Sequence, residues 1–168
     1  MSYSLLYYPN EILRTPCEDV TEEDFQSEEF LKFLTKMVDQ LAAHKAVGIA
    51  APQLGLNKRV FLNNVDDRPQ FFINPKIVHS EGIIRMKEGC LSFPGIFLYT
   101  DRAAEVTVDA VDADGREFRA QLDGLDAVAA QHELDHLNGV LFIDHVSRLE
   151  RKMLLKKFAK NKKKFVFR

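Results

Sequence analysis

The chain has 168 residues, of which 46% are hydrophobic and 29% charged, an ordinary composition for a single globular domain. Its thirteen phenylalanines argue against disorder, and no stretch approaches the roughly 20 apolar residues of a membrane span. The N-terminus lacks the basic and apolar regions of a secretion signal. Two cysteines, Cys17 and Cys90, are too few for a disulfide scaffold. We therefore expect a cytoplasmic protein with no membrane association. The net charge of −2 does not by itself suggest a nucleic acid partner.

The first predicted element is a helix over residues 27–44, with Ser27 in position to cap it. Apolar residues recur there at spacings of three and four, which is typical of a helix with one buried face. These residues are Phe30, Phe33, Leu34, Met37, Val38 and Leu41.

Short strands are predicted next, because runs of β-branched and aromatic residues are interrupted by Asp66–Pro69 and by Asn74-Pro75. These strands are residues 59–65, 71–73 and 83–84. Further along, residues 105–111 and 117–122 flank the dipeptide Asp114-Gly115, which predicts a hairpin.

A second helix is predicted over residues 125–138, with Gly139 placed to end it. A third, over residues 147–163, has an apolar stripe. The stripe consists of Leu149, Met153, Leu154 and Phe158. We expect an α+β fold in which antiparallel strands pack around a central helix, the one over residues 125–138, plus a C-terminal basic helix.

The central helix contains the pattern His132-Glu-Leu-Asp-His136. Positions i and i+4 share one helix face, so both imidazoles can reach a single metal ion. Glu133 adjoins the first of them, as metal-assisted hydrolysis requires of a carboxylate that shuttles protons.

The third ligand has two possible sources. Metallopeptidases with the pattern His-Glu-x-x-His usually supply it downstream, where the candidates are Asp144, His145 and Glu150. The alternative lies upstream at Cys90, in a loop between predicted strands. A buried, small hydrophobic role is the common fate of a free cysteine, and for Cys17 we expect that role.

A third segment, residues 46–53, follows the first helix. Its small residues permit the close backbone approach that a substrate-binding strand needs, and it ends at the side-chain amide of Gln53.

Together the three segments resemble those of the peptide deformylase family, which removes the N-formyl group from new bacterial and organellar polypeptides. The family has three motifs. They are Gly-h-Gly-h-Ala-Ala-x-Gln, where h is an apolar residue and x any residue, Glu-Gly-Cys-Leu-Ser, and Gln-His-Glu-x-Asp-His. This chain has their counterparts, in the same order, at residues 46–53, 88–92 and 131–136. The likeness extends over nearly the whole chain, and the Cys-Leu-Ser motif is typical of the common bacterial form.

The resemblance implies that Cys90, His132 and His136 are the metal ligands. The family uses Fe(II) physiologically, and zinc, nickel or cobalt can replace it. Glu133 would accept a proton from the attacking water and return it to the departing amine. The Leu91 backbone N–H and the Gln53 side chain would stabilise the developing oxyanion.

The resemblance also implies a substrate pocket and its support. Four residues would contact the methionine side chain, and Gly48 would offer backbone hydrogen bonds to the peptide. The four are Val47, Leu125, Val128 and Ala129. Glu88 and Arg102 would form an ion pair that steadies the Cys90 loop.

One position departs from the family pattern, because Ala46 replaces the first glycine of the first motif. If the backbone there requires a positive φ, alanine would cost about 1 kcal/mol.

The charge of the chain is unevenly distributed. Residues 148–168 contain ten basic residues and one acidic residue, for a charge of +9, and the remaining 13 basic and 24 acidic residues give −11. We expect residues 1–147 to form a single catalytic domain and residues 148–168 a basic helix or tail. Related deformylases approach the ribosome through such a helix, so Lys156–Lys164 is expected to bind ribosomal RNA. The partners expected are thus formyl-methionyl peptides and the ribosome, and the chain is expected to be a monomer.

Two other functions are open to the sequence. A His-Glu-x-x-His peptidase with a downstream ligand would use only one of the three motifs. A noncatalytic RNA-binding module with a structural metal would leave Glu133 without a role.

Overall fold

The computed structural model describes residues 3–165, and the side chains of residues 3–161. The helices are α1 (Glu22–Gln26), α2 (Glu28–His44), α3 (Gly124–Leu137) and α4 (Arg148–Phe165). Three short 3-10 helices are η1 (Glu11–Arg14), η2 (Ala51–Leu54) and η3 (Phe142–His145). The strands are β1 (Gly48–Ala50), β2 (Val60–Val65), β3 (Arg68–Glu81), β4 (Ile84–Gly89), β5 (Phe97–Arg102), β6 (Glu105–Val111) and β7 (Glu117–Asp123).

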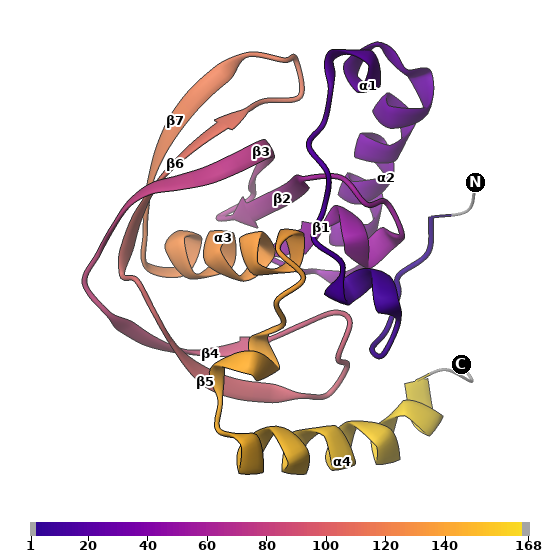
Figure 1. Ribbon diagram of the computed structural model, residues 1–168, viewed down its shortest axis with the longest axis vertical. Helices are drawn as coiled ribbons and strands as arrows, with labels where there is room; N and C mark the ends of the chain where they lie inside the picture. Colours follow the sequence, from indigo (N-terminus) through magenta and orange to yellow (C-terminus); the bar gives the residue numbers. More distant parts are fainter. Residues whose placement is uncertain (1–2, 166–168) are drawn as a thin grey trace.

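The strands form two antiparallel sheets (Figure 1). Five strands pair in the order β1-β2-β3-β6-β7, and β4 pairs with β5 in a separate hairpin. In Figure 1 helix α3 lies between the larger sheet and this hairpin. The predicted α+β fold, with strands packed around the helix that carries the histidines, is confirmed.

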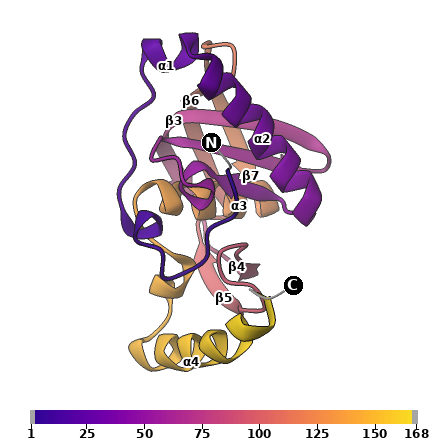
Figure 2. The same cartoon turned by 90° about the vertical axis from the view of Figure 1, so that its right-hand side faces the viewer.

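Helices α2 and α3 cover opposite faces of the larger sheet. Alternate residues of a strand point to opposite faces. On β2, Val60 and Leu62 belong to the hydrophobic cluster formed with α2, whereas Phe61 packs with α3 residues such as Ala127 and Ala130. Figure 2 shows α2 lying across the sheet.

The predicted helices lie where their periodicity placed them, with errors at the margins. Ser27 occupies the N-cap position of α2, but its side chain makes no capping hydrogen bond. Val38 was expected on the buried face and is 39% exposed. Gly139 follows α3 with φ +72°, as expected of a residue that ends a helix.

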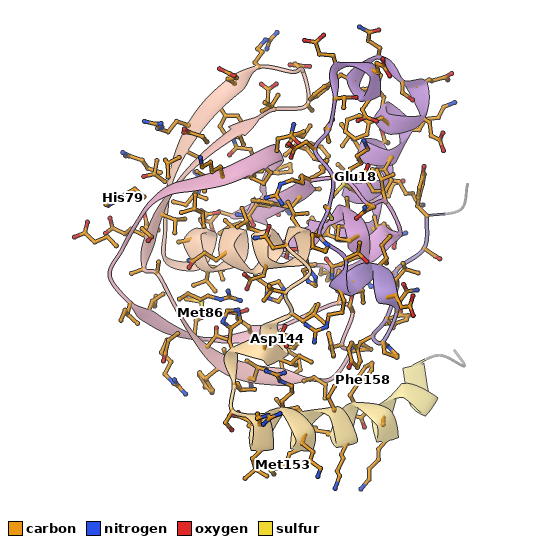
Figure 3. All side chains as sticks on the ribbon, in the orientation of Figure 1. Glu18, His79, Met86, Asp144, Met153 and Phe158 are labelled. Carbon is orange, nitrogen blue, oxygen red and sulfur yellow. The ribbon has the colours of Figure 1, made fainter. Side chains whose placement is uncertain are left out.

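The apolar stripe predicted for α4 is only half correct. Phe158 is buried and Leu154 is partly buried, and both pack against the protein. Leu149 and Met153 are 71% and 63% exposed, because α4 contacts the body along a narrow line. Figure 3 shows Phe158 directed toward the body and Met153 directed away from it.

Strand β3 is longer than predicted, because Asn74-Pro75 bends the strand instead of ending it. Asn74 has φ +50°, and the pairing register with β6 shifts between Ile73 and Lys76. The Asn74 side chain accepts a hydrogen bond from Val20 N (2.8 Å) and donates one to Val20 O (2.9 Å). The residues predicted to break the chain after β2 form a tight turn at Asp66 and Asp67, both of positive φ.

Candidate active site

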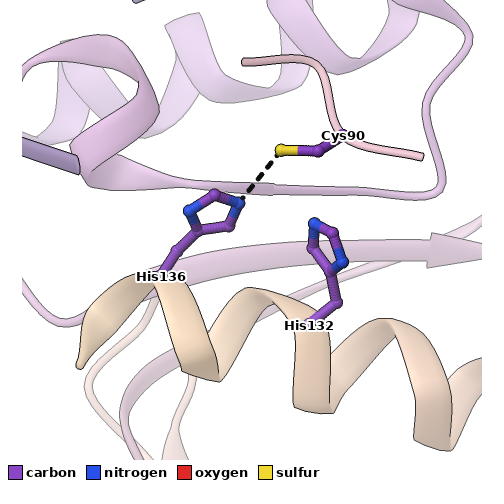
Figure 4. A group of neighbouring side chains, drawn as sticks. All are labelled: Cys90, His132 and His136. Atoms are coloured by element: carbon purple, nitrogen blue, oxygen red, sulfur yellow. Dashed lines mark hydrogen bonds between the residues drawn. The ribbon is translucent and has the colours of Figure 1, made fainter. Parts of the chain in front are cut away.

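The three sulfur and nitrogen donors predicted from the sequence lie together. Helix α3 carries His132 and His136, both buried, one turn apart on the face toward the β4–β5 hairpin. Cys90 follows directly after β4. One ligand atom from each residue lies within 4.8 Å of the others, and Cys90 Sγ is 3.4 Å from His136 Nε2 (Figure 4).

A buried ion pair fixes the orientation of His132. Glu88 Oε2 accepts a hydrogen bond from His132 Nδ1 at 2.6 Å, which leaves Nε2 free to bind a metal ion. Arg102 donates to both Glu88 oxygens, at 2.7 and 3.0 Å, and Thr100 donates to Oε1. Burial works to raise the pKa of Glu88, but the hydrogen bonds from His132 and Arg102 outweigh it and hold that pKa well below its ordinary value.

The network continues from Arg102 toward the protein surface. Asp135 accepts hydrogen bonds from Arg102 (2.6 Å) and from the imidazole of His145 (2.7 Å). Arg102 thus lies between two carboxylates, Glu88 on the metal side and Asp135 on the outer side.

Glu133 lies beside the three donors with one oxygen unused. Its side chain is buried, and Oε2 has no hydrogen-bond partner among the residues that the structure describes. Burial raises the pKa of Glu133 to about 7, a value suited to a group that both accepts and returns a proton. Gly48 makes room for it, since a Cβ at Gly48 would lie 2.6 Å from Glu133 Oε1.

His136 is equipped as a neutral ligand. Burial lowers its pKa well below the ordinary value, and within the described part of the chain Nδ1 has no hydrogen-bond partner. A cysteine sulfur with two imidazole nitrogens is a donor set that divalent transition metals accept. The residues present therefore fit a bound metal ion.

Gln53 is held in place by three hydrogen bonds. Its Oε1 accepts from Ala50 N at 2.9 Å, which is the local bond that closes η2. Its Nε2 donates to Ser92 Oγ at 3.2 Å and to Cys90 Sγ at 3.6 Å. The amide donor is thereby directed to the sulfur of the candidate metal site.

A cleft of about 680 Å³ opens onto this site. Glu133, Cys90, Leu91 and Gln53 line it. The residues predicted to bind substrate line it as well: Val47, Gly48, Leu125, Val128 and Ala129. Two strand edges, β1 at the rim of the larger sheet and β4 of the hairpin, border the cleft.

The family model for polypeptide deformylase matches residues 2–152. The chain belongs to the peptide deformylase family. Peptide deformylase 1 of Shewanella oneidensis is 40% identical over 159 residues, which are 93% of each chain. Peptide deformylase 2 of Xanthomonas axonopodis pv. citri is 39% identical over 95% of each chain. The chain is thus a metal-dependent hydrolase that removes the formyl group from the N-terminal methionine of nascent polypeptides.

Solved deformylases share the fold along its full length. The crystal structure of a deformylase from Legionella pneumophila aligns with a TM-score of 0.93 and 36% identity, over 100% of this chain and 99% of that one. The deformylase from Synechococcus elongatus, solved in complex with actinonin, aligns with a TM-score of 0.86 and 37% identity, over 94% and 86%. No described helix of the present chain has the length and apolar character needed to span a membrane.

The downstream alternatives for a third ligand are placed elsewhere in this deformylase. Asp144 forms an ion pair with Arg14, and His145 is bonded to Asp135. Glu150 is exposed on α4. None of the three joins the group of donors formed by the described residues.

The alanine that replaces the family's first glycine is not strained. Among the described residues, the nonglycine positions with positive φ are Lys45, Asp66, Asp67 and Asn74. Lys45, rather than Ala46, takes the left-handed conformation that ends α2. The expected cost of alanine at this position therefore does not arise.

Several contributors to the site were not foreseen in the sequence. Ser92 and Thr100 are buried hydrogen-bond partners of Gln53 and Glu88. Phe97, Met86 and Lys87 of the β4–β5 hairpin line the cleft. A prediction of strand β5 would have revealed Thr100, because it shares a face with Arg102. The buried Cys17 has the packing role expected of it, and burial raises its pKa to about 11.

Proposed function

We propose that Cys90, His132 and His136 hold one divalent cation, Fe(II) in the cell, and that zinc, nickel or cobalt can replace it. The observation that carries this proposal is the convergence of one sulfur and two imidazole nitrogens within 4.8 Å. Bound there, the cation supplies the Lewis acidity that amide hydrolysis requires.

Glu133 transfers the proton. Its buried carboxylate accepts a proton from the attacking water and returns it to the amine nitrogen as the bond to the formyl carbon breaks. The free Oε2 and the raised pKa of about 7 support this role. The products are formate and a peptide with a free N-terminus.

Gln53 and Leu91 stabilise the oxyanion that develops on the formyl oxygen. Gln53 Nε2 already points to Cys90 Sγ, and Leu91 lines the same cleft next to Cys90. A donor fixed before the reaction, as Gln53 is by Ala50 and Ser92, is typically worth about 3–4 kcal/mol of transition-state stabilisation.

The methionine side chain packs against Val47, Leu125, Val128 and Ala129, which line the cleft. Gly48 lies on β1, the edge strand of the larger sheet as described, and supplies backbone hydrogen bonds to the peptide. The Glu88–Arg102 ion pair steadies the Cys90 loop, since Glu88 lies two residues before Cys90 and its carboxylate also holds His132.

The decisive experiment assays the Fe(II) enzyme, prepared without oxygen, on formyl-Met-Ala-Ser. Oxygen is excluded because oxidation of iron or Cys90 would imitate an inactive enzyme. We expect the unaltered enzyme to release formate. The Glu133→Gln variant should release it at least about 100-fold more slowly, because it lacks the general base. That variant should keep its metal, whereas Cys90→Ser should lose it. Turnover by Glu133→Gln at the original rate would contradict the proposed mechanism.

We infer that residues 1–147 form the catalytic domain of a cytoplasmic monomer, and that the basic C-terminal segment, residues 148–168, contacts the ribosome. Supporting the contact, Lys156, Lys157 and Lys160 are exposed on α4. The side chains of Lys162–Lys164 lie outside the described residues.

Ribosome binding is best tested by changing charge on α4, because deletion would also remove the buried Phe158. We expect the triple change of Lys156, Lys157 and Lys160 to glutamate to abolish co-sedimentation with ribosomes at low salt, while peptide turnover is kept. Unchanged co-sedimentation would contradict the contact.

A further inference from the structure

The mouth of the cleft is basic, although the body around it is acidic. Residues 1–147 carry a net charge of −11. The exposed charged groups that line the cleft are nevertheless Lys45 and Lys87, and His44, next to Lys45 in the chain, also lines it. Its acidic lining residues, Glu88 and Glu133, are buried below. A peptide that enters the cleft therefore first meets positive charge.

Lys87 is held at the mouth by an aromatic ring. Its ammonium lies 5.3 Å from the centroid of the Phe97 ring, which is a cation–π distance. Phe97 is 57% exposed. Its ring lies against Gly89, its partner across the hairpin, where a Cβ would be only 2.7 Å from a ring carbon. Glycine at position 89 is thus what lets the ring pack on the strand and support Lys87.

The two lysines approach the cleft from different elements. Lys45 ends α2 just before β1, and Lys87 lies on β4. Strands β1 and β4 are the two whose outer edges, unpaired within the described part of the chain, border the cleft. Both lysines line the cleft, so a peptide bound along it lies close to positive charge contributed by both walls.

We propose that Lys87, supported by Phe97 and opposed by Lys45, makes this enzyme select formyl-methionyl peptides with an acidic side chain at the second or third residue. The selection rests on the proposed function of the cleft. A formylated N-terminus carries no charge, so in a nascent chain, or in a short peptide with an amidated C-terminus, the charge near the cleft comes from side chains. Carboxylates are attracted to the mouth, and lysine or arginine side chains are repelled.

The test compares kcat/KM of the metal-loaded enzyme on peptides that differ in one side chain. The substrates are the C-terminal amides of formyl-Met-Xaa-Ser and formyl-Met-Ala-Xaa, with Xaa glutamate, glutamine or lysine. At low salt we expect glutamate to exceed lysine by about 3- to 10-fold at one of the two positions. The ratio should fall toward one at about 0.5 M salt, because the lysines are exposed.

Two variants, Lys87→Glu and Phe97→Ala, connect the preference to Lys87, and a third serves as the control. Lys87→Glu should invert the ratio so that lysine is preferred over glutamate. The matched control is Lys32→Glu, the same charge change on an exposed residue of α2 that does not line the cleft. This control should leave the ratio unaltered. Phe97→Ala should weaken the preference by freeing Lys87.

The outcomes are separable. The unaltered enzyme could release formate from all peptides at equal rates, or faster from the lysine peptides. Either result would overturn the selection and leave the proposed function intact. An equal response to Lys87→Glu and Lys32→Glu would also overturn it. Failure to release formate from any peptide would overturn the proposed function, and the selection with it.

Discussion

The two histidines of the candidate metal site differ in the hydrogen-bond partner of their Nδ1 atoms. Glu88 accepts a hydrogen bond from His132 Nδ1, whereas His136 Nδ1 has no partner among the described residues. A carboxylate on the remote nitrogen fixes the tautomer of a ligating imidazole and increases its basicity. His132 is therefore the oriented ligand, and its geometry depends on the Glu88–Arg102 pair.

Glu88→Gln should weaken metal binding. An amide in place of the carboxylate removes the charge that balances Arg102 and weakens the acceptor for His132. We expect a 10- to 100-fold loss of metal affinity, about the range for changes to the partner of a ligating histidine. Competition with a zinc chelator measures it. Glu81→Gln, an exposed change on β3, should leave the affinity unaltered. Equal affinities for Glu88→Gln and the unaltered enzyme would refute the orienting role.

Gly48→Ala should displace the carboxylate of Glu133, because the added methyl group would lie 2.6 Å from Oε1 and 2.9 Å from Cγ. Both groups are buried, so we expect a destabilisation of about 1–3 kcal/mol from overpacking and a fall in kcat. Urea unfolding and formate release measure the two effects. Ala46→Gly, two residues away at ordinary φ, should cost only about 0.5–1 kcal/mol and keep kcat. A fully active Gly48→Ala enzyme would show that Glu133 is not held by this contact.

Among the elements, those with a regular apolar period were predictable and those shaped by buried polar groups were not. The 3.6-residue period of α2 predicts a helix because its core contacts are hydrophobic. On β5 two aromatic residues, Phe97 and Tyr99, are exposed together with Asp101, while Thr100 and Arg102 are buried beside Leu98 and bond to Glu88. Its pattern therefore has the reverse of the usual polarity at all positions except Leu98 and Asp101. The buried face of β5 supports the candidate metal site through Glu88. The motif residues of that site could be predicted from the sequence, whereas β5, which supports them, could not.

The bend in β3 provides a prediction for an element. Asn74 combines φ +50° with two hydrogen bonds to the backbone of Val20, which attach the N-terminal segment to the sheet. Asn74→Gly should lose about 1–3 kcal/mol of stability, because it keeps the conformational freedom but removes the hydrogen bonds. Asn74→Ala should lose about 1 kcal/mol more, since alanine also disfavours positive φ. Denaturant unfolding of the two variants separates these effects. Equal stabilities would show that the conformation at Asn74 carries no cost for alanine.

For the molecule as a whole, a hydrophobic cluster that contains Phe93, Phe142 and Phe158 joins the basic helix to the catalytic part. Phe158 of α4 packs against Phe93, with ring centroids 5.3 Å apart. Phe93 lines the cleft, and Cys90 packs against the same cluster. Helix α4 therefore presents lysines to its surroundings on one side and supports the loop after β4 on the other.

Phe158→Ala tests this connection, with Met153→Ala on the same helix as the matched control. Phe158 is 4% exposed, so truncation should cost about 3–5 kcal/mol. Met153 is 63% exposed and should change stability by at most about 0.5 kcal/mol. Because Phe93 loses part of its packing, the Phe158 variant should also bind metal more weakly below its unfolding transition, which a chelator competition measures. Similar stabilities for the two variants would mean that α4 does not dock through Phe158. A large loss of stability with unaltered metal affinity would mean that docking supports the fold without reaching the Cys90 loop.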